Sequence, residues 1–505
     1  MLFLMTTSAT PPVIAASTAH PVILVNAPQA LVTPQVYDWP MPGHDPSHTS
    51  TMIGPGPYIG HKLNTKELAG PASYSAAAAN GTIYVSGGGK TYALNSSTLK
   101  TLWSSPVGAA STAVASSGGL VYLGTSAGVV FALYGATGLT AWSLNLHSPV
   151  YSSPIVQNGE VFVAAFNSTL YAISAQTGKV NWKYITGGTI QSSPAANGTL
   201  VAIGSNDGTV NFVSEATGQQ YWTLGNLGPV RSSVTFSSDI AYFGSNDSAV
   251  YAVNTATKTR LWHYTTGGPV VATPVVADGL VLVGSLDGNL YGLKSANGNP
   301  QWTLTTGAID QQGAVAYASK INTQPTGIPE FYVPTMSGTL YAVEVDNGTA
   351  MWMYPLTGTN GGPAIVAYTK IYIGSGSGLV TELGSLRGAT AAGTFTTSGI
   401  PDRVFQSTAT VMLASNTAWA EFGVGGAMVN VYDPNGNHVL VNQTMTFSPG
   451  NKLYNFYYDY SFANAAPGRY RVVVWIEDGH SKMGSSNPRC CGWVFFRASF
   501  VVNGT

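Results

Sequence analysis

Residues 281–302, VLVGSLDGNLYGLKSANGNPQW, decide the fold, because copies of this segment recur along the chain. Two close copies are residues 201–222, VAIGSNDGTVNFVSEATGQQYW, and residues 121–142, VYLGTSAGVVFALYGATGLTAW. Within each copy, apolar residues recur at every second position, as expected of a β-strand. Turn-forming pairs such as Asp287-Gly288 separate these strands, as in β-hairpins. Each copy therefore predicts three short strands joined by tight turns.

Tryptophan closes these copies at a nearly constant interval. The residues Trp103, Trp142, Trp182, Trp222, Trp262 and Trp302 are spaced by 39, 40, 40, 40 and 40 positions, and Trp352 follows after 50. A further strand precedes each unit, as in residues 151–156, YSSPIV. Four strands in about 40 residues are typical of one blade of a β-propeller.

The end of each unit resembles the pyrroloquinoline-quinone-type propeller repeat, whose signature is Ala-x-Thr-Gly-x-x-x-Trp. Here it is Ala136-Thr137-Gly138 before Trp142, Gln176-Thr177-Gly178 before Trp182, Ala216-Thr217-Gly218 before Trp222, Ala296-Asn297-Gly298 before Trp302, and a variant, Ala256-Thr257-Lys258, before Trp262. The resemblance covers roughly residues 38–385. In such a propeller we expect each tryptophan to wedge between neighbouring blades, because one thin blade cannot form a core alone.

The repeats predict eight blades. Seven full units end at Trp103 through Trp352, and an eighth, residues 362–383, has three strands but no closing tryptophan. Residues 36–40, VYDWP, form an orphan strand with an eighth tryptophan, and we expect this strand to pair with the last blade and close the ring. The ten extra residues before Trp352 fall around residues 321–327, a predicted loop on one face.

The chain is therefore predicted to be all-β, with an eight-bladed β-propeller over residues 38–386 closed by an N-terminal strand. Residues 387–400 form a linker, and the alternating strands of residues 401–505 indicate an immunoglobulin-like β-sandwich. Residues 1–37 contain no charged side chain and form either a leader remnant or an extended arm. Such an arm would pair with a sheet edge, which could belong to a neighbouring subunit.

Charge is scarce in this chain. It has 505 residues with 20 Lys plus Arg and 21 Asp plus Glu, which is 8% charged residues against about 25% in a typical soluble protein. The net charge of -1 and the lack of basic clusters argue against nucleic-acid partners. The sequence contains no run of 18 consecutive apolar residues, so no transmembrane segment is predicted. Low charge with many uncharged polar residues favours an extracellular or cell-surface location, the surface of a virion included.

Eight Asn-x-Ser/Thr triplets are candidate glycosylation sites if the protein is secreted. They begin at Asn80, Asn95, Asn167, Asn197, Asn246, Asn347, Asn442 and Asn503. Because Ser and Thr are abundant, chance alone produces nearly as many triplets, and their number decides little.

The repeat resemblance implies a quinoprotein dehydrogenase, whose quinone lies beside a vicinal disulfide and a calcium ion bound by carboxylate and amide groups. Cys490-Cys491 is a vicinal pair, but it lies in the C-terminal domain and not in the propeller. The propeller carboxylates are scattered, and several, such as Asp207, Asp247 and Asp287, lie in blade turns. We therefore expect no cofactor. A strained disulfide, two free thiols and intermolecular bonds all remain open for the cysteine pair, with a structural disulfide preferred.

Two further motifs are compatible with metal ligands. His44 and His48 are four residues apart, but Pro46 and the preceding strand exclude helical ligand spacing, so we interpret them as capping or surface residues. Residues 433–437, DPNGN, lack the later Glu of a calcium loop and predict a hairpin turn. We expect no metal site.

One set of side chains is predicted to face the central channel. Alignment of the innermost strands places at one level Tyr151, Gln191, Arg231, Val271, Asp310 and Asn360. Arg231 and Asp310 are the charged members. They could hold a small polar ligand, although a pair that lines the channel without binding anything is the preferred interpretation.

These observations predict a non-catalytic extracellular surface scaffold that acts in assembly or adhesion. Its partners would be other copies of itself or other surface proteins, with glycans as further candidates. A finer version is a repeating subunit of an extracellular filament, surface layer or virion appendage. The alternatives are a quinone-dependent dehydrogenase and a carbohydrate-binding or envelope-assembly propeller.

Overall fold

The structure is a computed structural model that describes residues 38–384, apart from 54–55, 58–60, 73–74, 311, 318–319, 322–323, 326–328 and 359–361. Outside this range it describes only the backbone of strand β1 (Val22–Ile23) and of strands β37 to β45. The chain divides into two compact units, Ala30–Arg387 and Met1–Gln29 with Gly388–Thr505. Every regular element in the described residues is a strand, and none forms a helix that could cross a lipid bilayer.

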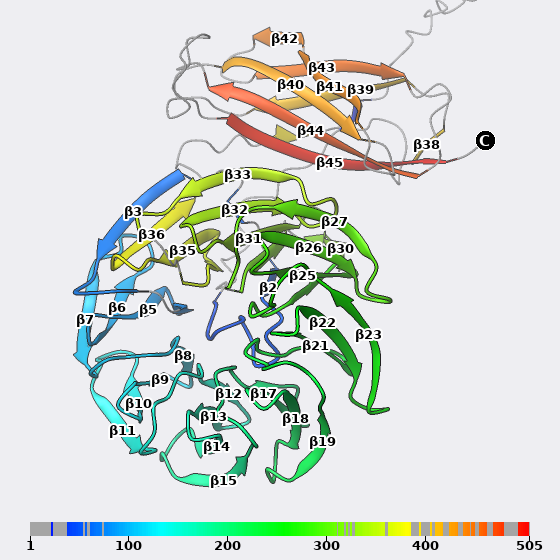
Figure 1. The fold of residues 1–505 in the computed structure, drawn as a ribbon. Coiled ribbons are helices and arrows are strands. Elements are labelled where there is room, and N and C mark those ends of the chain that lie inside the picture. Colours follow the sequence, from blue (N-terminus) through cyan, green and yellow to red (C-terminus); the bar gives the residue numbers. More distant parts are fainter. Residues whose placement is uncertain are drawn as a thin grey trace, which may run out of the picture. The chain divides into compact units, whose positions relative to one another are not determined.

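The first unit is an eight-bladed propeller of four-stranded antiparallel blades, which confirms the predicted fold class (Figure 1). From the innermost to the outermost strand, the blades are: blade 1, β4 (Ala77–Ala79), β5 (Thr82–Gly87), β6 (Lys90–Asn95), β7 (Thr101–Pro106); blade 2, β8 (Ala115–Ser117), β9 (Leu120–Gly124), β10 (Val129–Tyr134), β11 (Thr140–Asn145); blade 3, β12 (Ile155–Gln157), β13 (Glu160–Ala165), β14 (Thr169–Ser174), β15 (Val180–Ile185); blade 4, β16 (Ala195–Ala196), β17 (Leu200–Ser205), β18 (Thr209–Ser214), β19 (Gln220–Leu224); blade 5, β20 (Thr235–Ser237), β21 (Ile240–Ser245), β22 (Ala249–Asn254), β23 (Thr259–Thr265); blade 6, β24 (Val275–Ala277), β25 (Leu280–Gly284), β26 (Asn289–Lys294), β27 (Pro300–Thr305); blade 7, β28 (Ala314–Tyr317), β31 (Glu330–Pro334), β32 (Thr339–Glu344), β33 (Ala350–Pro355); and blade 8, β34 (Ile365–Ala367), β35 (Lys370–Gly374), β36 (Leu379–Gly384), β3 (His61–Glu67).

Five of the seven repeated tryptophans lie in the seams between blades, as predicted. Trp142 on β11 donates its Nε1–H to the carbonyl oxygen of Ala175 in the next blade, at 2.8 Å. Gly178 of that blade lies against the indole, so that a Cβ atom there would be 2.8 Å from Trp142 Cδ2. The same pairing recurs at Trp103–Gly138, Trp182–Gly218, Trp262–Gly298 and Trp302–Gly348. The glycine of the repeat signature therefore makes room for the preceding blade's indole.

An N-terminal strand closes the ring, but it is not the predicted one. Strand β3 pairs antiparallel with β36 of blade 8, with Lys66 opposite Val380. The predicted strand, residues 36–40, instead contributes Trp39, which forms an isolated bridge to Ala78 on the innermost strand of blade 1 and is 1% exposed. The physical reason is burial. Trp39 packs inside the molecule, whereas the polar sequence of β3 suits an outermost strand that faces solvent.

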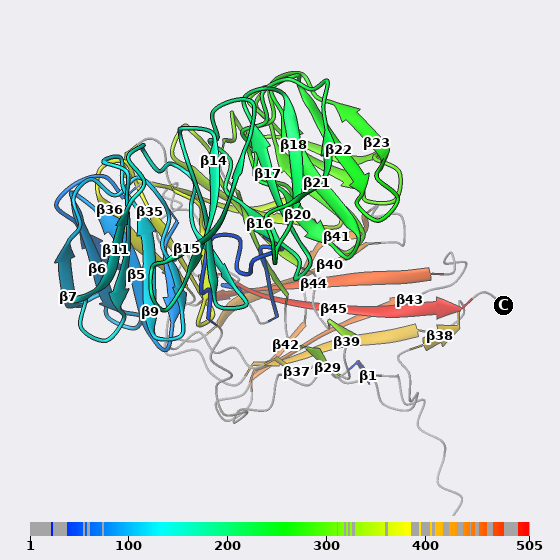
Figure 2. The same ribbon diagram turned by 90° about the horizontal axis from the view of Figure 1, so that it is seen from below.

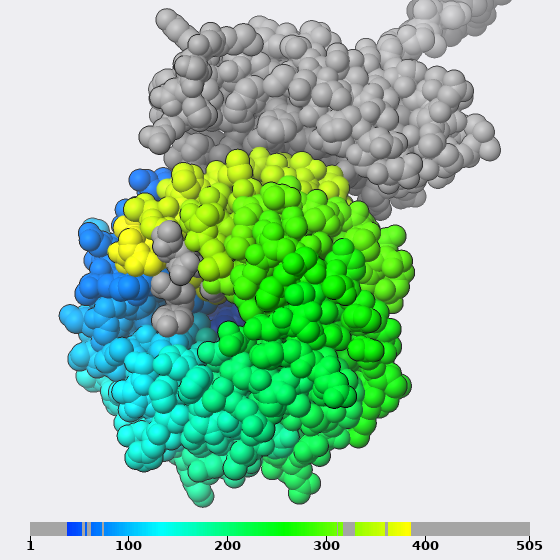
Figure 3. Space-filling model, in the orientation of Figure 1, coloured from blue at the N-terminus to red at the C-terminus, as the bar shows by residue number. Residues whose placement is uncertain are grey.

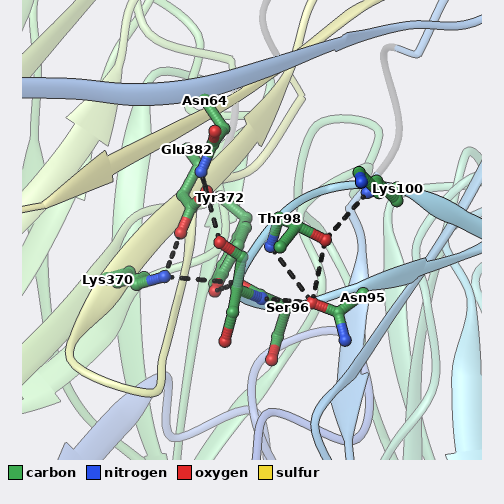
Figure 4. A network of polar contacts seen from close by, with 9 residues as sticks. Asn64, Asn95, Ser96, Thr98, Lys100, Lys370, Tyr372 and Glu382 are labelled. Carbon is green, nitrogen blue, oxygen red and sulfur yellow. Dashed lines mark hydrogen bonds and ion pairs between the residues drawn. The ribbon is translucent and has the colours of Figure 1, made fainter.

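A polar network reinforces the closing seam (Figure 4). Asn64 on β3 donates a hydrogen bond to Glu382 on β36, and Lys370 on β35 forms an ion pair with the same carboxylate. Tyr372 donates to the carbonyl oxygen of Ser96 in blade 1 at 2.6 Å. Glu382 is fully buried. The network therefore links the closing strand, blade 8 and blade 1 around one buried carboxylate.

Residues 38–53, which we call the hub segment, cross the centre of the ring and end in β2 (Thr51–Ile53) (Figures 1 and 2). Backbone hydrogen bonds join this segment to the innermost strands of blades 1, 2, 4, 5 and 7. The carbonyl oxygens of Trp39, Pro40, Pro46, Ser47 and Ser50 accept these bonds from the N–H groups of Ala78, Ser116, Ala196, Phe236 and Val315, at 2.6 to 2.9 Å. The segment therefore ties distant blades together.

The predicted loop in blade 7 contains a small hairpin. Strands β29 (Lys320–Ile321) and β30 (Gln324–Pro325) pair antiparallel between the first and second strands of the blade. Strand β2 of the hub segment pairs in parallel with β28 of the same blade.

The second unit contains two five-stranded sheets. One combines β1, β37 (Gly393–Thr394), β39 (Thr410–Thr417), β42 (Thr446–Pro449) and β43 (Tyr454–Ser461), and the other combines β38 (Val404–Gln406), β40 (Val424–Tyr432), β41 (His438–Thr444), β44 (Gly468–Asp478) and β45 (Trp493–Asn503). The immunoglobulin-like character of this unit stays a prediction.

Candidate functional site

The channel of the propeller holds a cavity of about 290 Å³, which we call the hub cavity (Figure 3). Pro42, Gly43 and His48 of the hub segment lie at the cavity together with residues that precede the innermost strands. The structure places around it five of the predicted channel residues, Tyr151, Gln191, Arg231, Val271 and Asp310. The sixth, Asn360, lies outside the described residues.

A belt of hydroxyl groups from blades 3 to 6 lines part of this cavity. The N–H of Ala113 donates to Ser153 Oγ at 3.0 Å, and the N–H of Ser153 donates to Ser193 Oγ at 2.9 Å. The N–H of Ser193 then donates to Ser233 Oγ at 2.9 Å, and that of Ser233 to Thr273 Oγ1 at 3.3 Å. Each bond joins one blade to the next, and all four hydroxyl-bearing residues line the cavity. This belt was not predicted from the sequence, although the Ser-Ser-Pro repeats at residues 152–154 and 192–194 have its period.

Arg231 is held in place from outside the belt. Its Nε–H donates to Asn206 Oδ1 at 3.1 Å, and the Asn206 amide in turn donates to Thr189 Oγ1 at 2.7 Å. The guanidinium group is thus oriented through Nε, which leaves its terminal nitrogens available to the cavity.

His48 differs from its predicted role, because it is buried and not a surface residue. It is 1% exposed, and its ring forms a hydrogen bond of poor geometry with the backbone of Val234. Burial lowers the pKa of His48 to about 4, partly offset by the charge of Asp45. The ring is therefore neutral near pH 7. The predicted capping role belongs to Asp45, which accepts a hydrogen bond from the N–H of Thr49 at 3.1 Å.

The hub segment also borders a second cavity of about 570 Å³. Ser47, Thr49 and Thr51 line this cavity, whereas His48 lines the hub cavity. The remaining lining comes from the turns at residues 197–199 and 236–239, together with Val276. Its surface carries hydroxyl, amide and carboxylate groups.

The carboxylates in the blade turns serve the fold. Asp287 accepts hydrogen bonds from the N–H of Gly267 at 2.7 Å and from the hydroxyl of Tyr291 at 2.7 Å. Asp247 accepts equivalent bonds from Gly228 and Tyr251. Among the described residues, no group of three His, Cys, Asp or Glu side chains is placed to hold a metal ion.

The remaining predicted sites are spread over both units. Asn80 and Asn167 are exposed in turns, and Asn95, Asn197, Asn246 and Asn347 are half-buried. Asn442 and Asn503 lie in strands β41 and β45, and Cys490 and Cys491 lie outside the described residues. No structural observation tests glycosylation or the state of the cysteines.

Solved structures share the fold at low sequence identity. BamB from Moraxella catarrhalis superposes with a TM-score of 0.54 at 16% identity, over 65% of this chain and 100% of that chain. The computationally designed protein Ika8 superposes with a TM-score of 0.57 at 16% identity, over 65% of this chain and 100% of that chain. Quinohemoprotein alcohol dehydrogenase from Comamonas testosteroni superposes with a TM-score of 0.57 at 13% identity, over 69% of this chain and 81% of that chain. Such identities show a common fold, and the fold is compatible with several functions.

A comparison with curated proteins found no significant match. A family profile described as outer membrane protein assembly factor BamB matches residues 59–144, 92–210 and 206–419, which together cover well over half of the chain. The matched segments include all eight blades and their repeated tryptophans. The chain therefore belongs to the family of the outer membrane protein assembly factor BamB.

Proposed function

We propose that this chain is a non-catalytic scaffold that binds other proteins at a cell surface or outside the cell, in assembly or adhesion. The outer rim of the propeller carries this proposal. Leu102, Ile185 and Met353 on outermost strands are 56%, 72% and 61% exposed. They lie on blades 1, 3 and 7, so a partner that covers the outer rim would bury apolar side chains at several points.

The edges of these strands support the same conclusion. Strands β7, β11, β19, β27 and β33 contain no charged residue. Soluble proteins usually place charges on exposed edge strands to prevent pairing with other chains, as this chain does with Lys62, Lys66 and Glu67 on β3. The uncharged rim strands therefore fit partner docking, including strand addition.

A finer version is that the chain is a repeating subunit of an extracellular filament, surface layer or virion appendage. Strand β1 of the N-terminal arm pairs in parallel with β39, with Val22 opposite Met412 and Ile23 opposite Leu413. An arm that adds a strand to this sheet within one chain could add the same strand to the sheet of a neighbouring copy.

Deletion of residues 1–35 tests this version. The deletion leaves the hub segment and all eight blades intact, so circular dichroism and tryptophan fluorescence should match those of the full chain. We expect the full chain to form polymers in electron microscopy and light scattering, and the deleted chain to stay monomeric. Polymers unchanged by the deletion, or a full chain that remains monomeric, would contradict the repeating-subunit version.

Similarity to the alcohol dehydrogenase structure supports a second candidate, a quinone-dependent enzyme. The described residues do not fit the cofactor set that the repeat resemblance implies. Asp310 is the one carboxylate among the residues that line the hub cavity, and Arg231 adds a positive charge there. The vicinal pair Cys490-Cys491 belongs to the other unit. After incubation with pyrroloquinoline quinone and calcium, we expect no bound chromophore and no dye reduction. A bound chromophore that reduces dye would refute the non-catalytic proposal.

An envelope-assembly role, which the family description suggests, is a special case of partner docking. Carbohydrate binding is the third candidate. The second cavity favours it, because hydroxyl, amide and carboxylate groups such as those of Ser237, Asn197 and Asp239 suit a polyol ligand. Titration with oligosaccharides, with Asp239→Asn as the test variant, would distinguish this candidate from protein docking.

A further inference from the structure

We infer that the hub cavity binds a small oxyanion, such as a carboxylate or phosphate group. This site goes beyond the proposed scaffold function, because it concerns a small molecule in the channel and not a protein on the rim. The inference comes from the hydroxyl donors around the cavity and from one fixed cation.

The hydroxyl belt presents donors to the cavity. Ser153, Ser193 and Ser233 each accept a backbone N–H bond from the preceding blade. Each serine oxygen accepts one of these bonds, so each hydroxyl keeps its hydrogen for donation and one lone pair for acceptance. Among the described residues, no donation from these three hydroxyls competes for the hydrogen. Several O–H donors therefore converge on one cavity, and converging donors are complementary to an anion.

Arg231 supplies the positive charge for such an anion. Its Nε–H bond to Asn206 fixes the plane of the guanidinium group. Arg231 and the belt residues line the same cavity, so one ligand can contact both. Paired N–H groups of arginine match the geometry of carboxylate and phosphate oxygens.

His48 lies at the wall of the same cavity, and its ring is 1% exposed. A hydrogen bond to the backbone of Val234 engages the one N–H donor of the neutral ring. His48 therefore contributes to the shape of the cavity, and the donors for an anion come from Arg231 and the hydroxyl belt.

Asp310 limits the type of anion. Its side chain lines the same cavity, where an ionised carboxylate would oppose a bound anion. A singly charged ligand is therefore preferred to a multiply charged one.

Calorimetric titration of the full-length protein with acetate and with inorganic phosphate, at constant ionic strength, tests the inference. We expect saturable binding of one equivalent of at least one probe. Arg231→Gln should weaken it at least tenfold. Arg260→Gln is the matched control, because it removes the same charge from the exposed outer strand β23 and should leave the affinity unchanged. Absence of saturable binding, or equal effects of the two variants, would overturn the inference.

Asp310→Asn provides the second arm. Removal of the repelling charge should tighten acetate or phosphate binding severalfold, and phosphorus NMR line widths should report the change for phosphate independently of heat. The relative affinities of acetate and phosphate identify which group the cavity prefers. Weaker anion binding by Asp310→Asn, or binding of glycine betaine without binding of acetate or phosphate, would show that the ligand class is wrong.

Discussion

Gly298→Ala tests the role of the tryptophan wedge directly. Gly298 has a φ of +74°, and a Cβ atom there would lie 2.6 Å from Trp262 Cε3. The indole cannot move aside easily, because it is 8% exposed and its Nε1–H donates to the carbonyl oxygen of Ser295 at 2.9 Å. The substitution should therefore disturb the seam between blades 5 and 6.

Gly279→Ala is a matched control in blade 6. Gly279 has a φ of +75°, but nothing lies within 4 Å of a Cβ atom built on it. Both variants incur the conformational cost of alanine at positive φ, about 1–2 kcal/mol. Gly298→Ala adds an overpacking cost of about 1–3 kcal/mol. We expect it to lower the free energy of unfolding by about 2–5 kcal/mol in total, and the control by about 1–2 kcal/mol.

Urea unfolding followed by tryptophan fluorescence measures this difference, after circular dichroism has shown that both variants fold. The midpoint of Gly298→Ala should lie clearly below that of Gly279→Ala at a similar slope. In a Trp262→Leu background the gap should shrink, because the indole that meets the new methyl group is absent. Equal midpoints of the two alanine variants in the native background would refute the wedge argument.

Three further predictions concern the closing seam, the hub and a second wedge. Lys370→Met should reduce the free energy of unfolding by about 3–5 kcal/mol, because Glu382 is left buried without a counter-ion. Adding Glu382→Gln should recover most of this loss in urea unfolding. An unchanged urea midpoint for Lys370→Met alone would contradict the prediction. The pKa of His48 is lowered from 6.5 to about 4 in the folded protein, so between pH 6.5 and pH 4 the unfolded chain binds more protons than the folded one. The free energy of unfolding should therefore fall as the pH drops from 6.5 to 4, by about 3 kcal/mol in all. The urea midpoint of His48→Asn should depend less on pH than that of the unchanged protein. His263→Asn, at an exposed position, should keep the full pH dependence. Trp302→Ala should cost about 3–5 kcal/mol through loss of the wedge and of its bond to the carbonyl of Val345, and a loss below 1 kcal/mol in the same assay would contradict that role.

Much of the hub site could be predicted from the sequence, but its chemistry could not. The 40-residue period places Tyr151, Gln191 and Arg231 at the same level of successive blades, and the structure finds them around one cavity. The hydroxyl belt has the same period. What the period does not show is the direction of each hydrogen bond, because that depends on whether each serine side chain reaches back to the preceding blade. The burial of His48 could not be predicted either, since it comes from contacts with residues far away in the sequence.

The sequence by itself determined the all-β class, the number of blades and the positions of the five tryptophan wedges that the structure shows. These features are repeated and local: alternation sets a strand, Gly-containing pairs set the turns, and a constant interval places Trp142 and Trp182 at the same point of successive blades. Only the tertiary structure decided which N-terminal strand closes the ring and where Trp39 lies. Several extended segments near the N-terminus could pair with blade 8, and the choice of β3 depends on burying the apolar segment at the hub while a polar strand faces solvent.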